Sequence, residues 1–135
     1  MTRYKCSLIP GDERPQIMVD ANGRRLAGYQ YIFDFRLVQK DKVGQPDEDR
    51  DAKEHRVSLE ASIDQLNHLE KTNKQVPDAE ARMLYWFARK ALERGENSTK
   101  LDLGNRDAKI DLSRVDLQPF ELDLPGPIMG FHVGR

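Results

Sequence analysis

Apolar and polar residues alternate along the first forty positions, a pattern that indicates half-buried β-strands. The alternation predicts a short strand from Arg3 to Ile9 and a second over Gln16-Ile17-Met18-Val19-Asp20. Asn22-Gly23 follows, and this dipeptide supplies the two positive-φ residues of a tight hairpin turn. We therefore predict a hairpin whose second strand is long and runs from about Arg25 to Gln39.

The long strand has one aromatic side. Because successive side chains of a strand point to opposite faces of the sheet, residues two positions apart share a face. On one face they are Tyr29, Tyr31, Phe33, Phe35 and Leu37. We expect this face to form the core, and the mixed opposite face to be solvated or partly covered.

Two helices are predicted in the middle of the chain, after a strand over 57–61. Ser62-Ile63-Asp64-Gln65 matches a capping box and starts a first helix that ends near Asn73. Pro77-Asp78 opens a second helix and Gly95 ends it, since proline suits a first helical turn and glycine a C-terminus. The apolar face of the second helix comprises Ala81, Leu84, Phe87, Ala88, Ala91 and Leu92.

Four segments in the last third of the chain share the order charged, aliphatic, Asp, Leu. They are Lys100-Leu101-Asp102-Leu103, Lys109-Ile110-Asp111-Leu112, Arg114-Val115-Asp116-Leu117 and Glu121-Leu122-Asp123-Leu124. Their irregular spacing favours strand alternation over a repeated binding motif. We predict two half-buried strands joined by the turn Gly104-Asn105-Arg106-Asp107, and then an extended segment.

These elements define an α+β fold with two layers, in which a mostly antiparallel sheet carries two helices on one face. We predict a single domain over residues 1–124, interrupted by a charged, mobile loop at about 40–54. Residues 125–135 are rich in proline and glycine and are predicted to be an extended tail. At 135 residues the chain is long enough to bury a core of its own.

Composition limits the classes of function. The chain has 22 Lys and Arg against 23 Asp and Glu, and this near-neutral balance disfavours a general nucleic-acid binder. No apolar run reaches the length of about 20 residues that spans a bilayer. Cys6 is the only cysteine and cannot form an internal disulfide, which suits a reducing compartment. We expect a cytoplasmic protein without membrane contact.

The residue types needed for metal binding or catalysis are sparse. His55, His68 and His132 have no ligand-like spacing, and the acidic run Asp47-Glu48-Asp49-Arg50-Asp51 lacks the glycine and glutamate of a calcium loop. The sequence contains no phosphate-binding loop and no hydrolase motif. We therefore expect no metal and no cofactor, and the balance leans away from an enzyme.

Trp86 is the most informative single residue. On a helical wheel it lies away from the apolar face, near Arg82, Arg89 and Lys90. A tryptophan among arginines is typical of a protein–protein hot spot. The competing interpretation is that Trp86 packs on its own domain, with a cation–π contact to Arg82 or Lys90.

Three functional hypotheses follow. The first is a non-enzymatic interaction or accessory module, with a protein partner or a second copy bound around Trp86 or at a strand edge. The second is a small-ligand binding protein or enzyme with a pocket between the aromatic strand and the helices, where Tyr29 and Tyr31 supply polar groups. The third is a weak nucleic-acid binder that uses Arg24, Arg25 and the basic end of the second helix.

Overall fold

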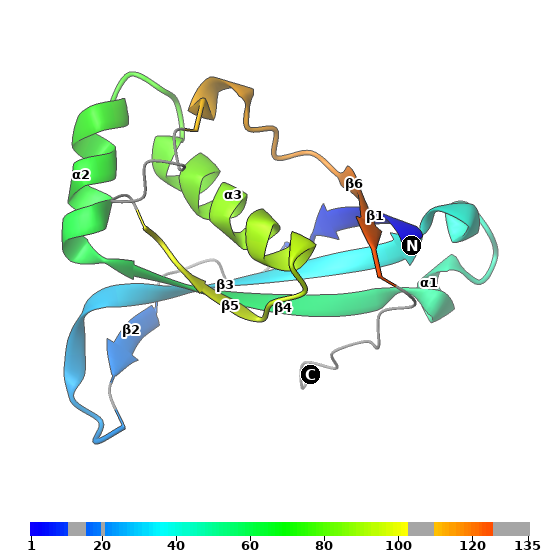
Figure 1. Ribbon diagram of the computed structural model, residues 1–135, viewed down its shortest axis with the longest axis horizontal. Coiled ribbons are helices and arrows are strands. Elements are labelled where there is room, and N and C mark those ends of the chain that lie inside the picture. Colours follow the sequence, from blue (N-terminus) through cyan, green and yellow to red (C-terminus); the bar gives the residue numbers. More distant parts are fainter. Residues whose placement is uncertain (11–15, 20, 103–109, 126–135) are drawn as a thin grey trace.

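The computed structural model describes residues 1–10, 16–19, 21–102 and 110–125, and it confirms the α+β fold (Figure 1). Its sheet has the strand order β5-β4-β3-β1-β6, with β2 also paired to β3, and curls as a half-barrel. The described strands are β1 (Thr2–Leu8), β2 (Gln16–Val19), β3 (Arg25–Gln39), β4 (Lys53–Ser62), β5 (Ser98–Lys100) and β6 (Phe120–Leu124). All pairings are antiparallel except that of β4 with β5.

Strand β3 is the centre of the sheet. It pairs with β4 from Gly28 to Leu37 on one edge, and with both β1 and β2 on the other. The predicted hairpin of β2 and β3 is confirmed. Of the two residues predicted to have positive φ, Gly23 has it, at 77°, and Asn22 does not. Figure 1 shows this hairpin bending away from the body of the protein.

The predicted aromatic face of β3 is the floor of the core. Tyr31, Phe33, Phe35 and Leu37 are at most 8 % exposed, while Tyr29 at the start of the row is only partly buried. Ring centroids of Phe35, Tyr85 and Phe120 lie 6.1–6.3 Å apart in tilted and edge-to-face pairs, which are favourable aromatic geometries.

Helices α2 (Ile63–Asn73) and α3 (Ala79–Glu93) cover this face, as predicted. The capping box is confirmed, because Ser62 Oγ accepts a hydrogen bond from the Gln65 amide and Gln65 Oε1 accepts one from the Ser62 amide. Figure 1 shows α3 lying obliquely, with its C-terminal end against the sheet and its N-terminal end farther from it.

The buried face of α3 is rotated from the predicted one. Met83 and Tyr85 are buried, whereas Ala81 is exposed and Phe87 is only partly buried. The rotation places the Tyr85 ring against Phe35 and Phe120, so contacts across the core decide the face.

Of the two strands predicted on either side of the turn at 104–107, the second is wrong. Where a strand was expected, Leu112–Arg114 forms the 3₁₀ turn η3, since the Asp111 carboxylate accepts a hydrogen bond from the Ser113 amide and turns the chain. The fourth segment is a strand and belongs to β6. The predicted turn Gly104-Asn105-Arg106-Asp107 and residues 126–135 of the predicted tail lie outside the described residues.

The charged segment 40–54 is more structured than predicted. It contains the 3₁₀ turn η1 (Lys40–Lys42) and the one-turn helix α1 (Glu48–Asp51), and β4 already begins at Lys53. Ion pairs hold it to itself and to the sheet, including Arg36 to Asp49 at 2.6 Å. No residue of either turn is buried.

Candidate functional site

A cavity of about 680 Å³ lies between β3 and the two helices, and we call it the main cavity. The floor comes from β3, one wall from the end of α2 and the α2–α3 connection, and the other from the first two turns of α3. The lining residues are Leu8, Tyr31, Phe33, Glu70, Asn73, Lys74, Val76, Asp78, Ala79, Glu80, Ala81, Leu84, Tyr85 and Leu117. The cavity occupies the place that the second functional hypothesis predicted.

Tyr31 is the predicted polar group that reaches the main cavity. Its hydroxyl donates a hydrogen bond to Glu80 Oε1 at 2.9 Å, which ties the first turn of α3 to the sheet. Burial, and then the hydrogen bond to Glu80, raise the pKa of Tyr31, so the hydroxyl remains a neutral donor. Tyr29, the other predicted group, packs at the edge of the core and is not among the lining residues.

Tyr85 forms part of the cavity wall and was not predicted. Its side chain is 2 % exposed, and its hydroxyl has no hydrogen-bond partner among the described residues. Burial raises the pKa of Tyr85 to about 12, because an apolar environment disfavours the phenolate. A spacing of four and then three residues from Ala81 through Tyr85 to Ala88 was the available signal in the sequence.

The rim of the cavity includes an aspartate whose backbone has the left-handed conformation. Asp78 precedes α3 with φ 54° and ψ 34°, and it is the non-glycine residue with positive φ in the described chain. Its side chain does not cap the helix. Instead, the Arg82 Nε donates to the Pro77 carbonyl oxygen at 3.2 Å and so holds the α2–α3 connection in place.

Arg82 makes further hydrogen bonds within the protein, and its predicted role in partner binding stays a prediction. Besides Pro77, its guanidinium donates to the carbonyl oxygens of Leu112 and Val115, and so joins the start of α3 to η3. These bonds use the Nε and one terminal nitrogen of the guanidinium. The other predicted partner-binding residues, Trp86, Arg89 and Lys90, lie along the next two turns of α3.

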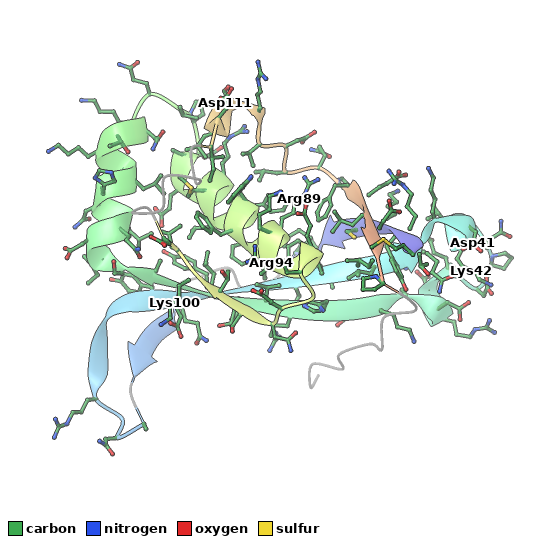
Figure 2. All side chains as sticks on the ribbon, in the orientation of Figure 1. Asp41, Lys42, Arg89, Arg94, Lys100 and Asp111 are labelled. Carbon is green, nitrogen blue, oxygen red and sulfur yellow. The ribbon has the colours of Figure 1, made fainter. Side chains whose placement is uncertain are left out.

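Trp86, Arg89 and Lys90 line a second cavity of about 410 Å³ between α3 and residues 110–116. Trp86 is partly buried, and the Lys90 Nζ lies 5.4 Å from its ring centroid, in cation–π range. Arg89 stacks over the Phe120 ring at 3.9 Å. Figure 2 shows Arg89 between α3 and the segment that leads into β6.

Carboxylates neutralise the cations of this second cavity. Lys90 pairs with Glu93 at 3.1 Å, Arg89 approaches Glu93 at 3.9 Å, and Arg114 pairs with Asp111 at 3.2 Å. The predicted cation–π contact to Lys90 is thus present. The role of Trp86 in partner binding stays a prediction, since a partly exposed ring is compatible with both interpretations.

The fold and the main cavity define an α+β domain whose half-barrel sheet holds a mostly apolar hollow under two helices. No protein-family model matches the chain, and neither a curated protein nor a solved structure matches it. In the described part of the chain, no helix has both the length and the apolar character needed to cross a membrane. The described residues also contain no group of three or more His, Cys, Asp or Glu side chains placed to hold a metal ion.

Proposed function

We propose that the protein binds a small, largely apolar molecule in the main cavity. The observation that carries this proposal is the cavity of about 680 Å³ between the aromatic face of β3 and the helices. Its volume lies within the range of about 300–1,000 Å³ that is usual for ligand pockets. Apolar side chains such as Phe33, Leu84 and Val76 would provide the affinity, and a few polar groups would orient the ligand.

The lining favours binding over catalysis. The described lining residues include no His, Cys, Ser or Thr, and the remaining groups there that could act as a base or nucleophile are the carboxylates Glu70, Asp78 and Glu80 and the amine of Lys74. The pKa values of both tyrosines are raised, so neither Tyr31 nor Tyr85 supplies a phenolate near neutral pH. The proposal is therefore a binding protein, located in the cytoplasm as the lone Cys6 predicts.

Filling the cavity tests this proposal. Ala81 is exposed and lines the cavity, so an Ala81→Trp side chain would occupy the hollow without displacing a buried residue. Asn67→Trp is the matched control, because Asn67 is exposed on α2 and does not line the cavity. The probe is naphthylmethanol, a neutral apolar alcohol, and the measurements are calorimetric titration and thermal unfolding.

Saturable binding to the wild-type protein is expected. At a hundredfold excess over Kd, the ligand adds about 2.7 kcal/mol of stability. That corresponds to a rise in Tm of roughly 10 °C for a domain of this size. The rise should persist in Asn67→Trp and disappear in Ala81→Trp. Equal binding by both variants, or no saturable binding by the wild type, would contradict the proposal.

A second candidate function, partner binding or self-association through Trp86, is supported by the second cavity beside its partly exposed ring. Trp86→Ala should then weaken dimerisation measured by sedimentation, whereas Asn67→Trp on α2 should not change it. An unchanged monomer–dimer equilibrium in Trp86→Ala would exclude this face as the contact between copies. Nucleic-acid binding has less support, since the cations near the end of α3 are paired with carboxylates, Arg94 with Glu96 at 2.9 Å among them.

A further inference from the structure

We infer that the ligand of the main cavity is an organic cation, a molecule with an apolar body and a protonated amine or quaternary ammonium group. This inference rests on the proposed function and adds the charge of the ligand to it. Three features of the cavity carry the inference: the charge of its lining, the state of its carboxylates and its aromatic wall.

The lining is acidic although the whole chain is nearly neutral. Glu70, Asp78 and Glu80 contribute three carboxylates against the one ammonium of Lys74, which gives the described lining a formal charge of −2. The net charge of all 135 residues is −1. A concave site with charges of one sign attracts ligands of the opposite sign, since its low-dielectric walls focus the field.

The carboxylates at the cavity are available to a ligand. In the part of the chain that the structure describes, neither Glu70 nor Asp78 takes part in an ion pair. The only partner of the Glu80 carboxylate there is the Tyr31 hydroxyl, which orients the carboxylate and leaves its charge in place. By contrast, Asp34 on the outer face of the sheet is neutralised by Arg56 at 2.8 Å.

Aromatic rings complete the recognition surface. Tyr31, Phe33 and Tyr85 all line the cavity, and a cation is attracted to the face of an aromatic ring within about 6 Å. Tyr85 contributes its ring to this wall and also lines the second cavity, and its hydroxyl is buried and unpartnered within the described residues. Aromatic rings with nearby carboxylates are the combination that binds ammonium groups.

A metal ion fits this site less well than an organic cation. Metal binding requires several oxygen ligands within about 2.6 Å of one point. No group of three or more carboxylate, imidazole or thiolate side chains with that potential occurs in the described chain. Carboxylates spread along the rim of an apolar hollow suit a ligand that is itself extended and carries its charge at one end.

Three probes that share a naphthalene ring separate the effect of ligand charge from that of ligand shape. They are naphthylmethylamine, naphthylmethanol and naphthoate. They are cationic, neutral and anionic at pH 7, and calorimetry gives a Kd for each on the full-length protein. We expect the amine to bind roughly threefold to tenfold more tightly than the alcohol, since each partly exposed charge pair contributes only modestly. Naphthoate should bind more weakly than the alcohol.

Conservative variants test whether the preference for the amine comes from the carboxylates at the rim of the cavity. Glu80→Gln keeps an acceptor for the Tyr31 hydroxyl, and Asp78→Asn keeps a residue that tolerates a left-handed backbone. Each should reduce the preference for the amine by about threefold and leave the Kd of the alcohol unchanged. Asp41→Asn is the matched control, because Asp41 is exposed at the end of the sheet opposite to α2 (Figure 2). Thermal unfolding verifies that each variant is folded.

The outcomes distinguish the inference from the proposed function. If the alcohol binds and the amine binds no more tightly, the cavity is a ligand site but its ligand is not a cation. Tighter binding of naphthoate than of the alcohol would also exclude a cationic ligand. If none of the three probes binds saturably, both the inference and the proposed function are wrong. An amine preference that Asp41→Asn reduces as much as Glu80→Gln would reflect overall charge and would overturn the inference.

Discussion

The buried hydroxyl of Tyr85 gives the sharpest test of the structure. Tyr85→Phe removes this hydroxyl and keeps the ring in its contacts with Phe35 and Phe120, whose centroids lie 6.3 and 6.2 Å away. A buried polar group without a hydrogen bond costs about 1–3 kcal/mol, because it has lost its water and gained no partner. Tyr85→Phe should therefore raise the free energy of unfolding by about 1–3 kcal/mol.

Urea denaturation measures this difference. With an m value of about 2 kcal/mol/M, each kcal/mol moves the midpoint by roughly 0.5 M. Tyr31→Phe is the matched control, since it removes the same atom from a neighbouring ring whose hydroxyl is bonded to Glu80. Tyr31→Phe should lower the free energy of unfolding by about 1 kcal/mol.

The two tyrosine substitutions should thus change the free energy of unfolding in opposite directions. If Tyr85→Phe lowers the free energy of unfolding by about 1 kcal/mol or more, the hydroxyl has a partner and the reasoning fails. If Tyr31→Phe raises it, the hydrogen bond to Glu80 contributes nothing. Coincident fluorescence and circular-dichroism transitions must first establish that unfolding is two-state, because the comparison of free energies depends on it.

Three further predictions concern stability and reactivity. Ser62→Ala removes the capping box of α2 and should lower the free energy of unfolding by about 0.5–2 kcal/mol in urea; an unchanged midpoint would mean that α2 does not depend on its cap. Asp78→Gly relieves the left-handed backbone at φ 54° and should raise Tm by a few degrees, corresponding to roughly 1 kcal/mol, whereas a lower Tm would show that the aspartate makes a stabilising contact. Burial raises the pKa of the Cys6 thiol from 9.0 to about 12, so the folded state keeps the thiol proton at pH values where the unfolded state has lost it. The stability that this group contributes is therefore present below pH 9 and is lost between pH 9 and 12. A series of denaturation measurements at rising pH that shows no decline in stability would refute this prediction.

Local signals explain which parts of the fold could be predicted. Asn22-Gly23 fixes its own turn, and Ser62 with Gln65 fixes the start of α2, because each acts within a few residues of backbone. The core face of β3 was predictable for the same reason, since the period of two depends only on strand geometry. These features need no knowledge of what lies across the core.

Distant contacts explain what could not be predicted. The buried face of α3 depends on Phe35 and Phe120, which approach Tyr85 from two other strands. The parallel pairing of Ser58 with Ser98 joins segments that both helices separate, and no local pattern encodes it. The same holds for the main cavity, where Tyr31 and Glu80 meet across 49 positions of sequence.

The shape of α3 accounts for the place of the main cavity. In its C-terminal half Ala88 and Ala91 are fully buried, and their small side chains let the helix approach the sheet closely. In its first turn Ala79 and Ala81 are equally small, but here the helix lies farther from the sheet, and both residues line the cavity (Figure 1). Larger side chains at these two positions would fill the cavity. Small residues above an aromatic floor therefore leave room at this end of the helix, and under the proposed function a bound molecule would occupy it.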